Sequence, residues 1–176
     1  MTTHTSPTGR ILVGIDGSAA SVPAVRWAAR EAELRGMRVH VLYVREQRPG
    51  VLAHYAPRPR VGEGGAGWKV GESTMKTVVK EALGAEPPAR VQLELADGLP
   101  ARVLLDRAVG AEMLVLGSGT AGVPPRTPLG PVARDCLHAA PCPVVVVRPA
   151  RAASRAGAAS VPTAAEPVPS GATRRG

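Results

Sequence analysis

ILVGIDGS, at residues 11–18, is an apolar run that ends in an acidic residue and two turn-forming residues. An uninterrupted run of Ile, Leu and Val is typical of a strand that is buried on both faces of a sheet. Asp16, Gly17 and Ser18 then favour a turn. The stretch therefore predicts a buried strand whose carboxyl end carries a carboxylate.

A helix is expected directly after this turn. Ser21 is a suitable N-cap, because its hydroxyl can accept a free amide of the first turn, and Pro23 then falls where a missing N–H is tolerated. The helix would end at Gly36, a favourable left-handed stop. One apolar face is expected to hold Val25, Ala28, Ala29 and Ala32. Strand, turn and helix make a βα unit.

The same alternation repeats along the chain. Further strands are predicted at residues 39–44, 91–95, 113–116 and 144–147. Helices are predicted over about 71–83, from Pro100 to the stop at Gly110, and after Gly130. In the third strand, Val91, Leu93 and Leu95 are expected to point inward; in the last helix, Ala133, Cys136, Leu137 and Ala140 are expected to share a face. The pattern predicts a doubly wound α/β fold, a five-stranded parallel sheet with helices on both faces.

We expect one domain at residues 10–149, which is interrupted by a mobile loop at 45–69, rich in Pro and Gly. Residues 1–9 and 150–176 are expected to be disordered, because the tail is dominated by Ala, Pro, Ser, Gly and Arg and offers little apolar area to bury.

Composition excludes several classes of protein. No apolar run is long enough to span a membrane, and the polar start lacks the apolar core of a secretory signal. The two cysteines are too few for a disulfide framework, so a cytoplasmic protein is expected. Although the formal charge is +8, the arginines are scattered and no aromatic residues alternate with them. Specific nucleic-acid binding is therefore not expected.

A loop rich in Gly and Pro follows the fourth strand. Gly117, Gly119 and Gly122 spell G-x-G-x-x-G, but Pro124 and Pro125 prevent the immediate helix that a dinucleotide fingerprint requires. A Walker-type loop is excluded too, because its Lys is absent. The carboxyl ends of parallel strands meet at one edge of a sheet, so this loop and the turn at Asp16 are expected to share a rim where ligands bind.

Neither a metal site nor a catalytic set is predicted. Cys136, His138 and Cys142 could suggest a metal trio, but Cys136 lies on the predicted apolar helix face and Cys142 directly precedes the last strand. Burial for structural reasons is the preferred interpretation. No Ser-His-Asp or paired-carboxylate set can be assembled, so we expect a protein that is not an enzyme, with weak ATP hydrolysis left open.

From Arg10 to Arg148 the chain resembles the universal stress protein family. The likeness is carried by residues 13–18 (VGIDGS) with Ser21 and Trp27, by 98–101 (GLPA), by 114–118 (LVLGS), and by 137–138 (LH) with 141–148 (PCPVVVVR). The resemblance implies a Rossmann-like sheet of strand order 3-2-1-4-5. It also implies a homodimer joined through the last strand, which the apolar run at residues 144–147 favours because such an edge invites pairing.

In the ATP-binding branch of that family, the resemblance assigns base contacts to Asp16 and Val44 and the phosphate loop to the segment from Gly117 to Gly130. Two positions depart from the family pattern. Thr120 replaces a glycine, and Pro131 replaces a Ser or Thr and removes a hydroxyl and an N–H. The full set of candidate binding residues is Gly14, Ile15, Asp16, Val44, Leu116, Gly117, Gly119, Thr120, Gly130 and Val132. ATP, with Mg²⁺ only when ATP is bound, is the implied cofactor, held weakly.

Two functions stay open from the sequence. One is a regulatory or sensor module that binds an adenine nucleotide weakly; the other is a nucleotide-free dimerising or protein-interaction module of the same fold, with an unknown protein partner. The residues also have simpler interpretations. Asp16 could only cap its turn, and the loop glycines could only form turns.

Overall fold

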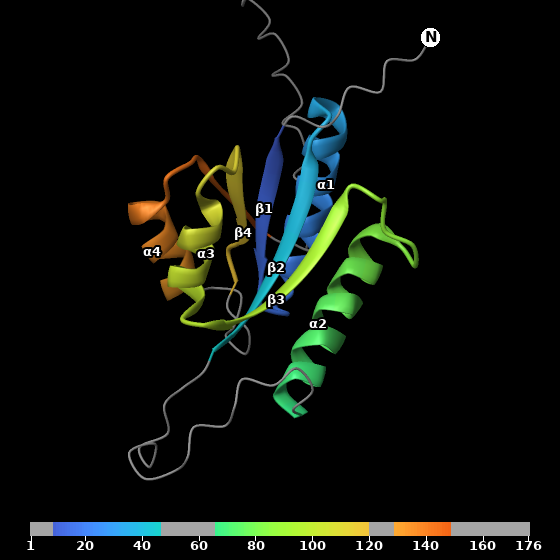
Figure 1. Cartoon of the computed structure of the whole chain (residues 1–176), viewed down its shortest axis with the longest axis horizontal. Coiled ribbons are helices and arrows are strands. Elements are labelled where there is room, and N and C mark those ends of the chain that lie inside the picture. The colour runs from blue at the N-terminus through green and yellow to red at the C-terminus, as the bar shows by residue number, and fades with distance from the viewer. Residues whose placement is uncertain (1–8, 47–65, 120–128, 149–176) are drawn as a thin grey trace, which may run out of the picture.

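The computed structural model describes residues 9–46, 66–119 and 129–148 (Figure 1). The elements are, in chain order, β1 (Arg10–Ile15), α1 (Ser21–Arg35), β2 (Arg38–Glu46), α2 (Ala66–Leu83), β3 (Val91–Gly98), α3 (Pro100–Ala108), β4 (Met113–Gly117), α4 (Pro131–Ala139) and β5 (Val144–Val147). Strands and helices alternate as predicted. The expected disordered termini lie outside the described residues.

The five strands form one parallel sheet in the order β3-β2-β1-β4-β5. The predicted fold class and strand order are confirmed. Helices α1 and α2 cover one face of this sheet, and α3 and α4 cover the other (Figure 1). Because every strand runs the same way, the carboxyl ends of β1, β2 and β4 share one rim.

The core consists of two apolar layers, one on each face of the sheet. Side chains alternate along β1, so that Val13 packs under α1 and α2 while Leu12 packs under α3 and α4. Both are fully buried. Burying one such side chain stabilises the fold by about 1.5–3 kcal/mol. In a chain without Phe, several small aliphatic residues replace the few large aromatic ones of an ordinary core.

The start of α1 differs from the prediction. Ala20 occupies the N-cap position in a helical conformation without a side-chain cap, and Ser21 is the first helical residue. The Ser21 hydroxyl turns back to the preceding turn and bonds Asp16. The expected stop at Gly36 is confirmed by its positive φ of 66°. Ser21 therefore ties the helix to the turn rather than capping the helix.

The predicted loop at 45–69 is too long at both ends. β2 continues to Glu46, whose register partner is Gly98, so the sheet between β2 and β3 extends to the rim. α2 starts at Ala66, earlier than the expected residue 71, and the Arg45 guanidinium lies over the Trp68 ring in its first turn. Contacts between distant segments, which local sequence does not reveal, set both limits.

Three predicted inward side chains are less buried than expected. Leu93 is 39% exposed on β3, which has one neighbour among the described strands, and Leu137 is 46% exposed on α4. Ala29 is half-buried, and Ala24 takes the fully buried place on α1. An edge strand such as β3 and a short helix such as α4 have fewer neighbouring elements to cover their apolar side chains. The hydrophobic periodicity of the sequence does not contain this information.

Candidate functional site

The turn after β1 is held by one carboxylate. Asp16 Oδ1 accepts hydrogen bonds from the Ser18 backbone N–H at 2.9 Å and from the Ser21 hydroxyl at 3.0 Å. The Asp16 N–H donates in turn to Ser21 Oγ at 3.2 Å. Asp16 thus has the turn-capping contacts that its simpler interpretation requires. The residue is nevertheless exposed at the rim, so these contacts do not bury it.

The exit of β4 lies directly against this turn. A Cβ added at Gly117 would stand 2.7 Å from the Ala20 Cβ and 3.0 Å from the Ala20 carbonyl oxygen. A Cβ added at Gly119 would stand 3.2 Å from Ser18 Oγ. Real Cβ atoms essentially never approach as closely as 2.7 Å, so packing within the protein requires the glycine at 117, whereas at Gly119 the neighbouring side chains would have to shift by a few tenths of an ångström. The β1 turn and the β4 exit at residues 117–119 therefore meet at one rim, as the sequence predicted, while residues 120–128 of the loop lie outside the described residues.

A buried hydroxyl marks this junction. Ser18 Oγ is shielded from solvent and has no hydrogen-bond partner within residues 9–46, 66–119 and 129–148. A buried polar group without a partner costs about 1–3 kcal/mol. Because the hydroxyl lies beside Gly119, an acceptor or donor placed at the junction would recover that free energy.

Several other candidate residues converge on the face of the sheet under α3 and α4. Leu116 belongs to the buried layer there, and Val44 and Val132 pack against it. Gly14 is packed in the same layer, since an added Cβ would lie 2.7 Å from a methyl group of Leu116. Ile15 instead belongs to the layer under α1 and α2. Thr120 lies outside the described residues.

The N-terminus of α4 points to the same rim. Gly130 is the N-cap, with extended backbone and no side-chain cap, and Pro131 occupies the first helical turn. The amides of Val132 and Ala133 have no acceptor within the helix, because the first turn lacks the preceding carbonyls. Such amides and the helix dipole favour an anion. Pro131 contributes no N–H, so this end offers fewer donors than an ordinary helix N-terminus.

Within the described residues, a cavity adjoins the rim on each side of the sheet. The larger, of about 700 Å³, lies between α3 and α4 and includes Leu99, Leu105 and Val132 in its lining. The other, of about 590 Å³, lies between α1 and α2 and includes Ser18 and Thr74. Pockets for small ligands commonly have such volumes. The first cavity shares Val132 with the candidate set.

Sequence reasoning missed an ion pair at the ends of β2 and β3. Arg45 Nε and Nη2 donate to the two carboxylate oxygens of Asp97 at 2.6 and 2.7 Å. The guanidinium carbon lies 5.6 Å from the centre of the Trp68 ring. This hydrogen bonding to Asp97 raises the pKa of Arg45. Arg45 and Asp97 are 52 positions apart in the chain. The sequence around either residue therefore does not indicate that the two side chains pair.

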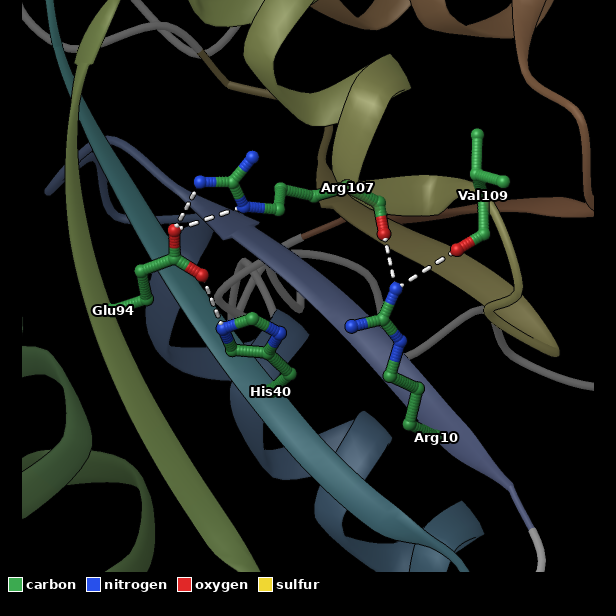
Figure 2. A network of polar contacts seen from close by, with 5 residues as sticks. All are labelled: Arg10, His40, Glu94, Arg107 and Val109. Carbon is green, nitrogen blue, oxygen red and sulfur yellow. Dashed lines mark hydrogen bonds and ion pairs between the residues drawn. The ribbon is translucent and has the colours of Figure 1, made fainter.

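A second missed network lies under α3 (Figure 2). His40 Nε2 lies 2.8 Å from Glu94 Oε2, and Glu94 Oε1 accepts from Arg107 Nε at 2.9 Å. Arg10 Nη2 donates to the Arg107 and Val109 carbonyls at 2.6 and 2.9 Å. Burial lowers the pKa of His40 below 6.5 despite the opposing effect of Glu94. Arg10 thereby caps the C-terminus of α3.

The two cysteines fit a structural role. Cys136 is fully buried in the layer under α4, and burial raises the pKa of its thiol to about 11. Burial also raises the pKa of Cys142. Within the described part of the chain, no group of three or more His, Cys, Asp or Glu residues could hold a metal ion. No described helix has the length and apolar character that crossing a bilayer requires.

Comparison with known proteins identifies a family. The model of the universal stress protein family matches residues 7–148. A curated universal stress protein of Mycolicibacterium smegmatis is 35% identical over 143 residues, which cover 78% of this chain and 47% of the relative. The chain thus spans about half the length of the curated relatives that it matches.

Solved structures share the fold. The universal stress protein from Archaeoglobus fulgidus in complex with dAMP superposes with a TM-score of 0.56 at 23% identity, over 79% of this chain and 97% of that one. A universal stress protein in complex with cAMP gives a TM-score of 0.54 at 19% identity, over 79% and 95% of the two chains. At this identity the likeness concerns the arrangement of strands and helices.

Proposed function

The chain belongs to the universal stress protein family, and on this premise we propose that it is a regulatory module whose rim between β1 and β4 binds an adenine nucleotide weakly. Two relatives of the same fold were solved in complex with dAMP and cAMP. The proposal carries their ligand class, and no more, over to this chain. It assigns the nucleotide a signalling role and no hydrolysis.

The observation that carries the proposal is the junction between the β1 turn and the β4 exit. There the buried Ser18 hydroxyl has no partner within the described residues, while Gly117 and Gly119 bring the two segments into contact. The uncapped N-terminus of α4 supplies the Val132 and Ala133 amides beside the same rim. A hydroxyl and helix-terminal amides are suitable donors for phosphate oxygens.

Within this proposal each part of the chain has a distinct task. Val44 and Val132 offer apolar surface to the base above buried Leu116, and the amides of the first turn of α4 orient the phosphate. Asp16 fixes the turn through Ser21, so that the rim is shaped before a ligand arrives. A bound nucleotide supplies the phosphate charge, and Mg²⁺ is expected only together with it.

Pro131 accounts for the proposed low affinity. A hydrogen bond from an amide to a charged oxygen contributes about 1.5–3 kcal/mol, so one missing N–H weakens binding by about one to two decades. The missing hydroxyl at the same position lowers affinity further. Restoring the hydroxyl and the amide in Pro131→Ser is therefore expected to increase affinity by at least tenfold, or about 1.4 kcal/mol.

Calorimetric titration with ATP and AMP, with and without Mg²⁺, tests this function. The variants are Pro131→Ser, Asp16→Ala and the control Glu33→Gln, a change at an exposed residue of α1. We expect weak binding in the wild type and the control, tighter binding in Pro131→Ser and weaker binding in Asp16→Ala. Circular dichroism establishes that Asp16→Ala is folded. Absence of binding in the wild type and in Pro131→Ser would refute the proposal.

A second candidate function is a nucleotide-free module that pairs with a second copy through β5. Among the described strands, β5 pairs with β4 alone. Leu114 N–H donates to the Pro143 carbonyl and Ser118 N–H to the Val147 carbonyl, so the odd-numbered residues of β5 face β4. In a parallel ladder the backbone groups of Val144 and Val146 then point outward. An apolar edge that no described strand covers is a template for another strand.

Light scattering on the wild type and Val146→Pro tests the second candidate. Proline removes an N–H that points away from β4, so the sheet within one chain is preserved while pairing with a second copy is weakened. The candidate predicts a dimer in the wild type and a monomer, or a much weaker dimer, in the variant. A wild-type monomer contradicts it.

A further inference from the structure

The C-terminal end of α3 is joined to three strands of the sheet by a polar network (Figure 2). The Arg107 side chain donates to Glu94 on β3, and Arg10 on β1 donates to the Arg107 and Val109 carbonyls at the end of the helix. His40 on β2 contacts the second carboxylate oxygen of Glu94. Because Arg10 is the first residue of β1, the network lies toward the opposite end of this strand from the rim.

The Glu94 carboxylate serves two partners at once. Its Oε2 lies 2.8 Å from His40 Nε2, and its Oε1 lies 2.9 Å from both Nε and Nη2 of Arg107. With His40 neutral, the carboxylate has one cationic partner here, Arg107; a protonated His40 is a second cation on the same group. The His40 side chain is 12% exposed and that of Arg107 is 46% exposed, so Arg107 is the partner that water can take up more readily.

The surroundings of His40 disfavour a positive charge on its ring. Burial is the main cause that lowers the pKa of His40, Arg10 and Arg107 lower it further, and Glu94 opposes them without reversing the direction. The charged groups that the described part of the chain places around this ring are Arg10 from β1, Arg38 two positions earlier on the same face of β2, Glu94 from β3, and Arg107 with its neighbour Asp106 from α3.

The last turn of α3 depends on this network. Val109, the C-cap residue, has extended backbone and not the left-handed conformation of a glycine stop. Arg10 therefore supplies the donors for two carbonyls at the helix end, while Glu94 holds the Arg107 side chain. Protonation of His40 places a further positive charge beside both attachments, because Arg10 and Arg107 each act on its ring.

Acid favours any state in which the His40 ring is hydrated. A hydrated imidazole has a pKa of about 6.5, which is above that of His40 in the folded domain. By linkage, an opening that hydrates the ring becomes more favourable as the pH falls below about 6.5. Complete unfolding is one such opening. Release of the last turn of α3 is a smaller one, because it breaks fewer contacts and Val109 at its end is already exposed.

We propose that Glu94 and His40 form an acid-sensitive latch for α3: with His40 neutral, Glu94 holds Arg107 and the C-terminal end of the helix on the sheet, and protonation of His40 releases that end. Leu105, two residues before Arg107, lines the cavity between α3 and α4. The latch thus links acidity to one wall of this cavity. It operates without a bound ligand, so it does not depend on the nucleotide binding proposed above.

Amide hydrogen exchange of the full chain at pH 7 and pH 5, corrected for the intrinsic exchange rate at each pH, tests the latch. The reporters are the amides of Ala108 and Ala111, the second of which donates to the Ala108 carbonyl. The reference is the amide of Ala28, a buried residue of α1. In the wild type, exchange at the reporters relative to the reference rises at least about threefold at pH 5. The upper limit is about 25-fold, for a ring that stays neutral while α3 is docked.

Three variants separate the parts of the latch. His40→Gln keeps a donor for Glu94 but cannot be protonated, so its exchange ratio is the same at both pH values. Arg107→Gln removes the side chain that Glu94 holds, so its reporters exchange faster than those of the wild type already at pH 7. The control His138→Gln removes an exposed imidazole on α4 and behaves as the wild type. Circular dichroism at both pH values establishes that each variant is folded.

A rise in the wild type and in His138→Gln that is absent in His40→Gln supports the latch. An equal rise at Ala28 and at the reporters would show that His40 acts only on global stability, which overturns the latch. An unchanged ratio in the wild type, or a rise of the same size in His40→Gln, overturns it too. A full rise retained in Arg107→Gln would also overturn it, because the released group would not be Arg107.

Discussion

Gly117→Ala tests whether the β1 turn and the β4 exit are in contact. The added methyl group would stand 2.7 Å from the Ala20 Cβ and 3.0 Å from the backbone carbon and oxygen of Ala20. Carbon atoms normally pack at about 3.5–4.0 Å, so one segment must move by up to about 1 Å. Because two of these neighbours are backbone atoms at the start of α1, no side-chain rotation relieves the contact.

Overpacking of this kind costs about 1–3 kcal/mol, which corresponds to a fall of about 2–12 °C in Tm for a chain of this size. Urea unfolding followed by circular dichroism gives the free energy directly. Gly119→Ala is the graded comparison: its nearest neighbours are side-chain atoms at 3.2 and 3.3 Å, so a smaller loss is expected. Unchanged stability in Gly117→Ala would show that the turn and the loop do not touch.

Three further predictions concern the rest of the domain. Because burial lowers the pKa of His40 below 6.5, the folded state binds this proton less readily than the unfolded state. The stabilisation by neutral His40 is therefore full above about pH 6.5 and is lost as the pH falls through the lower pKa of the folded state. In urea unfolding, the free energy of unfolding of His40→Gln should fall less on acidification than that of the wild type. Arg10→Gln should destabilise the domain by about 1–2 kcal/mol in the same assay at pH 7, because it removes the donors to the carbonyls at the end of α3; a wild-type value would contradict the capping role. Alkylation at pH 8, read by mass spectrometry, should modify half-buried Cys142 faster than fully buried Cys136, with equal rates in denaturant; a faster Cys136 in the folded state would contradict its packing.

The layered fold follows from sequence, because it depends on local patterns. The apolar run at residues 11–15 has the composition of a buried parallel strand, and the strands at 113–116 and 144–147 are found close to the predicted limits. Pro100 and Pro131 start helices, as proline at the first turn indicates. The shared rim then follows from the parallel order alone.

The errors arise where distant segments decide. Ser is a residue type that commonly caps helices, but the Ser21 hydroxyl donates to the Asp16 carboxylate and caps no amide of α1. β2 extends to Glu46 beside β3, where the pair of Arg45 with Asp97 links the two strands over a separation of 52 residues. Arg10 similarly reaches carbonyls of α3 that lie 97 and 99 positions away. Periodicity and capping rules describe neighbours in sequence and carry no information on such partners.

At the candidate site, the sequence correctly predicted that the β1 turn and the β4 exit meet. It did not predict which contacts require the glycines found there. The family resemblance assigns Gly117 and Gly119 to the phosphate loop, yet contact with the β1 turn alone requires Gly117 and leaves little room for a side chain at Gly119. Gly14 was assigned to the ligand and is packed against Leu116. A family motif shows which positions hold glycine but does not show whether ligand binding or internal packing requires it.

The most direct test of the account is amide chemical-shift mapping of the full chain during titration with AMP. Binding at the rim predicts saturable shifts at Gly117, Gly119 and Val132, and none at Gly84 or Val109, which follow the C-terminal ends of α2 and α3. Shifts confined to other surfaces, or no saturable shift at the first three amides, would contradict nucleotide binding at this rim.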